Sequence, residues 1–150
     1  DLLLHDVFMD LGERCTGPMP SFLEFYDKGV QPYAFDLARA RELLDESGWK
    51  DTNDDGIRDK VIDGAKKEFE FTLVVYGNSD EYRTLGNVFK EDLAKIGVKM
   101  TVQPLEFSSL LKEVHDREFD AVTLSHGAAG LLHAWCCAVP LMNAIAAGGR

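Results

Sequence analysis

The chain has 150 residues, of which 45% are hydrophobic and 28% are charged. This length is enough for one domain with a buried core, and the composition is ordinary for a globular domain. The net charge of −10 argues against nucleic acid as a partner, because phosphate backbones attract basic surfaces. No stretch reaches the roughly 18 apolar residues that a membrane span requires.

The chain starts with DLLLHDVFMD, which is acidic where a secretion signal is basic. An exported protein is therefore expected to be present here without its leader. The three cysteines, Cys15, Cys136 and Cys137, have no regular spacing. They predict no disulfide framework and do not indicate the redox compartment.

The N-terminal third is predicted to contain little regular structure. Leu3, Val7 and Leu11 have helical spacing and predict the end of a helix over residues 1–11. Residues 12–35 contain three glycines and three prolines and are predicted to form a surface loop. Its aromatic residues are expected to pack onto the body of the domain; they are Phe22, Phe25, Tyr26, Tyr33 and Phe35.

Residues 37–47 are predicted to form a helix, with Asp36 as its N-cap and Gly48 as its end. An acidic loop over residues 50–65 follows. The β-branched and aromatic segment at 69–76 then predicts a strand.

The rest of the chain alternates helix and strand. Patterning predicts a helix over 80–96, a strand over 98–104, a short helix capped by Ser108, and a strand over 119–124. The order β-α-β-α-β with short links predicts an α/β fold, in which a mostly parallel sheet is flanked by helices. Residues 128–150 form an Ala/Gly-rich tail whose structure the pattern does not indicate.

The acidic loop resembles the first nine positions of an EF-hand calcium loop. Carboxylate and amide oxygens recur at alternate positions, Gly56 permits a sharp turn, and Ile57 offers a backbone carbonyl. Calcium is a hard cation that prefers such oxygen ligands. The predicted ligands of a structural Ca²⁺ are Asp51, Asn53, Asp55, Ile57 and Asp59.

One ligand of that pattern is missing. The twelfth position, usually a bidentate glutamate, is Ile62, and Asp63 follows one place later. The alternative is a metal-free loop in which Asp and Asn side chains bind their own backbone. Both interpretations give the loop a structural role.

The patterns for catalysis are weak. There is no HExxH, nucleophile elbow or glycine-rich phosphate loop. His126 and His133 lie near Cys136 and Cys137, but their spacing matches no common zinc site. A small α/β enzyme would have His126 as its candidate titratable group, and we expect no enzymatic activity.

Four segments resemble, in order, the peptide- and nickel-type family 5 of bacterial extracellular solute-binding proteins. They are LGERCTGPMP (11–20), YAFDLARARELLDESGWKDTNDDGIRD (33–59), VVYGNSDEYRTLGNVFKEDLAKIGVKMTVQPLEFSSLL (74–111) and EFDAVTLSHG (118–127). Together the resemblance covers roughly residues 8–127.

The resemblance implies that residues 1–127 are part of the C-terminal lobe of a two-lobed protein with a type II periplasmic-binding-protein-like fold. It implies a peptide or similar small solute as ligand, docking on an ABC permease, and a periplasmic or extracellular location, membrane-associated where a lipid anchor is present. A missing lobe is expected to leave an apolar face near residues 22–35 or 128–147, which favours self-association. The alternative is a freestanding calcium-stabilised interaction module.

The resemblance also carries over two short segments that follow predicted parallel strands, where open α/β sheets bind ligands. The candidate ligand-binding residues are Gly77, Asn78, Ser79, Ser125, His126 and Gly127. The alternative is that they are ordinary loop residues. The family's aspartate for the ligand amino group has no counterpart, because no Asp follows Asp120.

Overall fold

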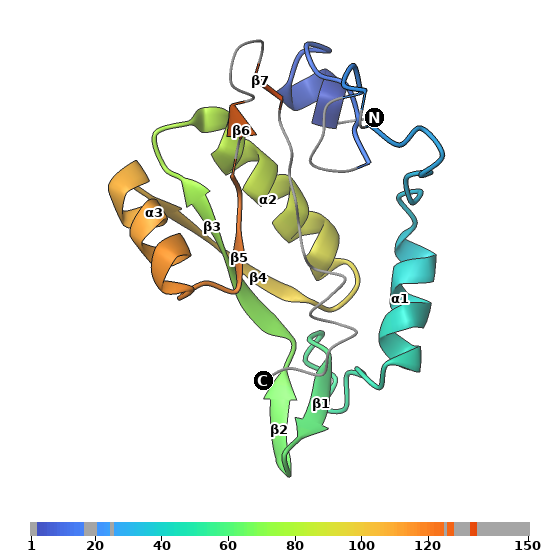
Figure 1. Cartoon of the computed structure of the whole chain (residues 1–150). Coiled ribbons are helices and arrows are strands. Elements are labelled where there is room, and N and C mark those ends of the chain that lie inside the picture. The colour runs from blue at the N-terminus through green and yellow to red at the C-terminus, as the bar shows by residue number, and fades with distance from the viewer. Residues whose placement is uncertain (1–2, 17–20, 25, 125, 128–132, 135–150) are drawn as a thin grey trace.

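The computed structural model describes residues 3–16, 21–24, 26–124, 126–127 and 133–134. Its centre is a parallel sheet with the order β4-β3-β5. The strands are β3 (Glu70–Tyr76), β4 (Lys99–Leu105) and β5 (Ala121–Val122). Helix α2 (Asp80–Ala94) connects β3 to β4, and α3 (Phe107–Asp116) connects β4 to β5. The two helices flank the sheet from opposite sides (Figure 1). The predicted α/β fold is confirmed.

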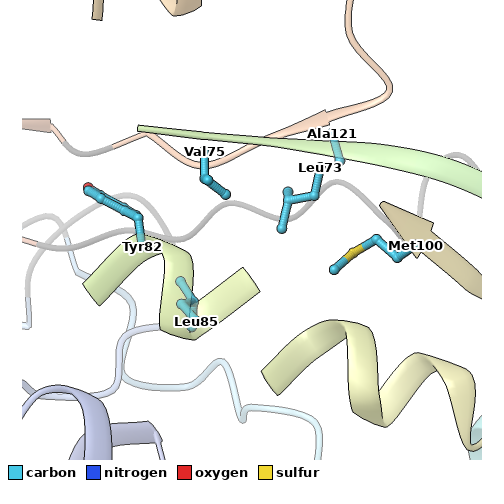
Figure 2. Close-up of a cluster of buried hydrophobic side chains, with 6 residues drawn as sticks. All are labelled: Leu73, Val75, Tyr82, Leu85, Met100 and Ala121. Carbon is cyan, nitrogen blue, oxygen red and sulfur yellow. The ribbon is translucent and has the colours of Figure 1, made fainter. Parts of the chain in front are cut away.

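Strand β3 is central because its apolar run allows burial on both faces. Leu73, Val74 and Val75 are buried, as is typical of a strand covered by helices on both sides. Figure 2 shows the cluster that joins this strand to α2, to β4 and to β5. Its buried members are Leu73, Val75, Tyr82, Leu85, Met100 and Ala121.

A second, smaller cluster attaches α1 (Leu37–Glu46) to the sheet layer. The predicted cap is confirmed: Asp36 Oδ1 accepts hydrogen bonds from the backbone N–H groups of Ala38 and Arg39, each at 2.9 Å. Leu44 is the buried residue of α1 and packs with Ile96 and Val98. The helix therefore rests on the end of α2 and the start of β4.

The predicted loop over 50–65 is wrong in its second half. Residues Asp59–Ile62 (β1) and Ala65–Glu68 (β2) form an antiparallel hairpin. Its two turn residues, Asp63 and Gly64, have φ of 53° and 79°, the left-handed conformation that a tight hairpin turn requires. The Asp-Gly pair is a hairpin signal, but β2 is exposed along its length and shows no apolar alternation that would have predicted a strand.

The N-terminal segment departs from the prediction. A π-helix, η1 (Leu3–Val7), replaces the expected helix tail, and the chain then turns through positive φ at Met9 and Asp10. Leu11 is 85% exposed, so the predicted apolar stripe ends early. The aromatic anchors are also wrong in part, because Phe22, Tyr33 and Phe35 are exposed. Phe25 lies outside the described residues.

Two smaller predictions about the last elements are corrected. Glu106, rather than Ser108, precedes α3, and its side chain makes no capping hydrogen bond. Strand β5 is shorter than predicted, and the carboxylate of Asp120 accepts a hydrogen bond from Thr72 N at 2.9 Å just before the ladder begins. No helix of the described residues combines the length and apolar character needed to cross a membrane.

Candidate functional site

The carboxyl ends of the parallel strands meet at one edge of the sheet. Tyr76 pairs with Leu105 at the end of the β3–β4 ladder, and β5 runs parallel on the other side of β3. The chain leaves all three strands at this edge, which is where open α/β sheets place ligands. Both predicted ligand-binding segments follow strands that end here.

Of the first predicted segment, Gly77 and Ser79 serve the fold. Gly77 N donates to Leu105 O at 2.8 Å, and a Cβ on Gly77 would lie 3.2 Å from Pro104 Cβ. Ser79 is the N-cap of α2, where its hydroxyl accepts from Tyr82 N at 3.3 Å. Asn78 between them is exposed. Its amide group is therefore available to a ligand.

Of the second predicted segment, the structure describes the backbone of His126 and Gly127. His126 and Gly127 form β6, which pairs with β7 (His133–Ala134) in an antiparallel ladder. Thr123 N donates to Val74 O at 3.0 Å, which extends the pairing of β5 with β3 by one residue towards the edge where Gly77 lies. Ser125 lies outside the described residues.

The structure adds an aromatic pair to this edge that the sequence did not single out. The rings of Tyr76 and Phe107 meet edge to face, with centroids 6.0 Å apart. Phe107 is 56% exposed because it starts α3 immediately beyond the end of β4. A phenylalanine two residues after a strand end was the available signal. The edge thus offers an amide and an apolar ring to a ligand.

The predicted calcium ligands at the other end of the sheet are engaged within the loop. Asp51 Oδ2 accepts from Gly56 N at 2.9 Å, and Asp55 Oδ1 accepts from Ile57 N at 2.8 Å. Asn53 Nδ2 donates to Asp55 Oδ2 at 2.7 Å. These contacts are the self-capping bonds expected of Asx-rich turns.

Asp59 is turned towards the hairpin. Its buried carboxylate accepts from Thr52 N at 3.0 Å and from Thr52 Oγ1, and Lys66 Nζ lies 2.9 Å away. Burial by itself would raise the pKa of Asp59, but Lys66 and the two Thr52 donors outweigh it and hold the pKa below its usual range.

The predicted calcium ligands therefore do not converge. Within the described part of the chain, no three His, Cys, Asp or Glu side chains come together as a metal site. A bound Ca²⁺ would require Asp59 to leave Lys66 and the loop to give up its internal hydrogen bonds. The arrangement fits the metal-free alternative, and calcium binding stays a prediction.

Comparison with known proteins identifies the family. The family model of the bacterial extracellular solute-binding proteins, family 5 Middle, matches residues 1–134. The chain is 36% identical over 100 residues to the oligopeptide-binding protein AppA of Bacillus subtilis, covering 65% of this chain and 18% of the relative. It is 28% identical over 135 residues to a probable ABC transporter-binding protein of Deinococcus radiodurans, covering 82% and 22%.

Solved structures agree with the sequence relatives. AppA from Bacillus subtilis in complex with a nonapeptide superposes with a TM-score of 0.72 at 32% identity, covering 80% of this chain and 24% of that one. NikA from Brucella suis in complex with Fe(III)-EDTA gives a TM-score of 0.70 at 28% identity, covering 81% and 24%. The fold is therefore that of periplasmic binding proteins.

The chain belongs to the bacterial extracellular solute-binding proteins, family 5. The predicted family is confirmed. The chain spans about a fifth of the length of the curated relatives that it matches, 18% and 22% for the two named above. The comparisons give no support to the alternative of a freestanding calcium-stabilised module.

Proposed function

We propose that this chain is part of the substrate-binding component of an ABC importer for peptides or similar small solutes. The observation that carries the proposal is the family match over residues 1–134, together with relatives named as oligopeptide-binding and ABC transporter-binding proteins. The carboxyl edge of the sheet, with its exposed Asn78 and Phe107, is the surface that faces the solute. The relatives are binding proteins, so the role is capture rather than catalysis.

The proposal includes export and a membrane partner. The family is described as extracellular, and we place the protein in the periplasm or outside the cell, with a lipid anchor as a further option in the full-length protein. Its partner is an ABC permease that accepts the captured solute. Fractionation of the source cells, followed by detection of the protein in the periplasmic or membrane fraction, tests this location.

Ligand capture is tested by titrating the protein with a pooled mixture of di- and oligopeptides and following binding by calorimetry. Asn78→Ala removes a side chain that is exposed at the sheet edge, and we expect a loss of about threefold to tenfold in affinity, the worth of one hydrogen bond. Lys67→Ala, on the exposed strand β2, is the matched control and leaves affinity unchanged. Equal affinities for all three proteins would contradict the assignment of this edge.

Self-association is a second part of the proposal. The segment from Met9 to Phe35 exposes large apolar side chains, among them Leu11 at 85% and Tyr33 at 78%. Exposed apolar side chains favour association where they gather into a patch. Sedimentation of the chain against a Tyr33→Ser/Phe35→Ser variant tests it, with a concentration-dependent oligomer expected for the parent chain and a monomer for the variant. The predicted apolar face at residues 128–147 lies outside the described residues.

A further inference from the structure

Three carbonyl groups in the turn that follows α2 receive donors from other segments of the chain. Arg41 Nη2 donates to Lys95 O at 2.7 Å. Arg58 Nε donates to Ile96 O at 2.8 Å, and Arg58 N donates to Gly97 O at 2.8 Å. The turn after α2 is therefore hydrogen-bonded to Arg41 of α1 and to Arg58, which precedes β1.

The guanidinium of Arg58 also binds acceptors at and just after the C-terminal end of α1. Arg58 Nη1 donates to Trp49 O and to Asp45 Oδ1, each at 2.6 Å. The side chain of Arg58 is 13% exposed, and its bond to Trp49 O is half-buried, whereas the bond to Asp45, whose side chain is 55% exposed, faces water. Lys60 Nζ adds a contact with Ser47 O at 2.8 Å. Cations are favoured at both places because helix C-termini carry partial negative charge.

The geometry explains why this residue is an arginine. Three acceptors, Ile96 O, Trp49 O and Asp45 Oδ1, lie in different directions around one planar group. A guanidinium presents several N–H donors in a fixed plane, whereas an ammonium is a single compact charge. The glycine at position 97 leaves space for the Arg58 side chain, because a Cβ there would lie 3.0 Å from Arg58 Cγ.

Apart from these bonds, α1 is attached by a small apolar contact. Leu44 is the buried residue of the helix, and Leu37 and Ala40 are half-buried against the same cluster. An open cleft of about 390 Å³, lined in part by Arg41, Asp45 and Arg58, lies between α1 and the end of α2. Figure 1 shows α1 at the periphery, apart from the faces covered by α2 and α3. Segments with few buried apolar contacts open locally at lower free energy than the core.

We propose that Arg58 is a positioning residue whose hydrogen bonds hold the C-terminal ends of α1 and α2 together. When these bonds are removed, α1 opens locally and separates from the rest of the domain as a unit. Detachment leaves the β3–β4 ladder and its cluster around Leu85 intact, because that cluster contains no residue of α1. The peripheral helix and the sheet are thus separate units of local stability.

The test is hydrogen–deuterium exchange by mass spectrometry on the whole chain. Arg58→Met keeps an apolar side chain and removes the donors. We expect amides of residues 41–49 to exchange roughly tenfold or more faster, as the loss of hydrogen bonds to a charged group implies, with β3 and β4 unchanged. Arg39→Met is the matched control, because Arg39 is an exposed residue of α1 that pairs with Glu42 and Glu46. It leaves exchange of the same segment within about twofold of the parent.

Arg58→Lys provides a second, milder variant should the first fail to fold. It keeps the charge and reaches fewer acceptors, so we expect faster exchange over 41–49 by a smaller factor and again no change in β3 or β4. Two results would overturn the proposal. One is unchanged exchange over 41–49 in the Arg58 variants, and the other is an equal acceleration in α1 and in the β3–β4 ladder.

Discussion

Gly86 lies where α2 packs closely against β4, and its replacement tests the packing directly. A Cβ at this position would lie 3.0 Å from Val102 Cγ1 and 3.2 Å from Cγ2. It would lie 3.6 Å from Val75 Cγ1, which is an ordinary contact. The conflict therefore involves one β-branched side chain of β4, which has little rotameric freedom to move away.

Two opposing effects set the size of the change. Alanine is favoured over glycine in a helix interior by about 1 kcal/mol, whereas overpacking of a well-packed site costs about 1–3 kcal/mol. We expect Gly86→Ala to lower the free energy of unfolding by about 1 kcal/mol, the balance of those two terms. In a Val102→Ala background, which lacks both Cγ atoms, the same change should instead raise it by about 0.5–1 kcal/mol.

Urea unfolding of the four proteins of this double-mutant cycle measures the effect. The predicted coupling between the two positions is about 1.5–2 kcal/mol, the difference between the effects in the two backgrounds. Asn87→Ala, at an exposed neighbouring position of α2, reports the propensity gain alone and should be neutral or slightly stabilising. A Gly86→Ala change that stabilises both backgrounds equally would refute the close packing of α2 on β4.

Three further predictions concern α3 and the acidic loop. Leu110→Ala should lower the free energy of unfolding by about 2–5 kcal/mol, because Leu110 is 1% exposed. Leu111→Ala, at a position that is 45% exposed, should lower it by less than about 1 kcal/mol. Comparable losses for the two variants in chemical denaturation would mean that α3 presents a different face to the sheet. The folded-state pKa of Asp59 is lowered, so its contribution is full above its unfolded pKa of about 3.9 and is lost as pH falls through the lower folded value. Stability below about pH 4 should thus fall more steeply for the parent chain than for Asp59→Asn in urea titrations, and parallel curves would count against the Lys66 and Thr52 contacts. Melting temperatures in millimolar calcium and in EDTA should agree because the loop oxygens already bind backbone amides, whereas a clear rise with calcium would support a metal site by linkage.

The main architecture was predictable because its signals are local. The Asp36 cap, the apolar stripe of α2 and the run of buried residues in β3 each lie within a few positions of one another. Their order then restricts the topology, since parallel crossovers are nearly always right-handed. The pattern did not decide the sheet order β4-β3-β5, with β3 in the centre, which the tertiary structure shows.

The position of the candidate residues at the sheet edge was predictable, and ligand binding there stays a prediction. Residues after strand ends are expected at the ligand edge, and Asn78 and Phe107 lie there. Ser79 was singled out by the same reasoning, but its hydroxyl caps α2. Whether a polar side chain faces a ligand or a backbone amide depends on geometry that spacing does not contain.

The sequence by itself determined the family, the β-α-β-α-β succession from β3 to β5 and the N-cap of α1, because these depend on residue types at short spacing. The tertiary structure decided what the acidic segment does. Asp59 pairs with Lys66 across a hairpin, and Arg58 reaches Ile96, 38 positions away. Such contacts exist only after the chain has folded back on itself, so a charge that resembles a metal ligand or a surface residue in the sequence becomes part of the framework.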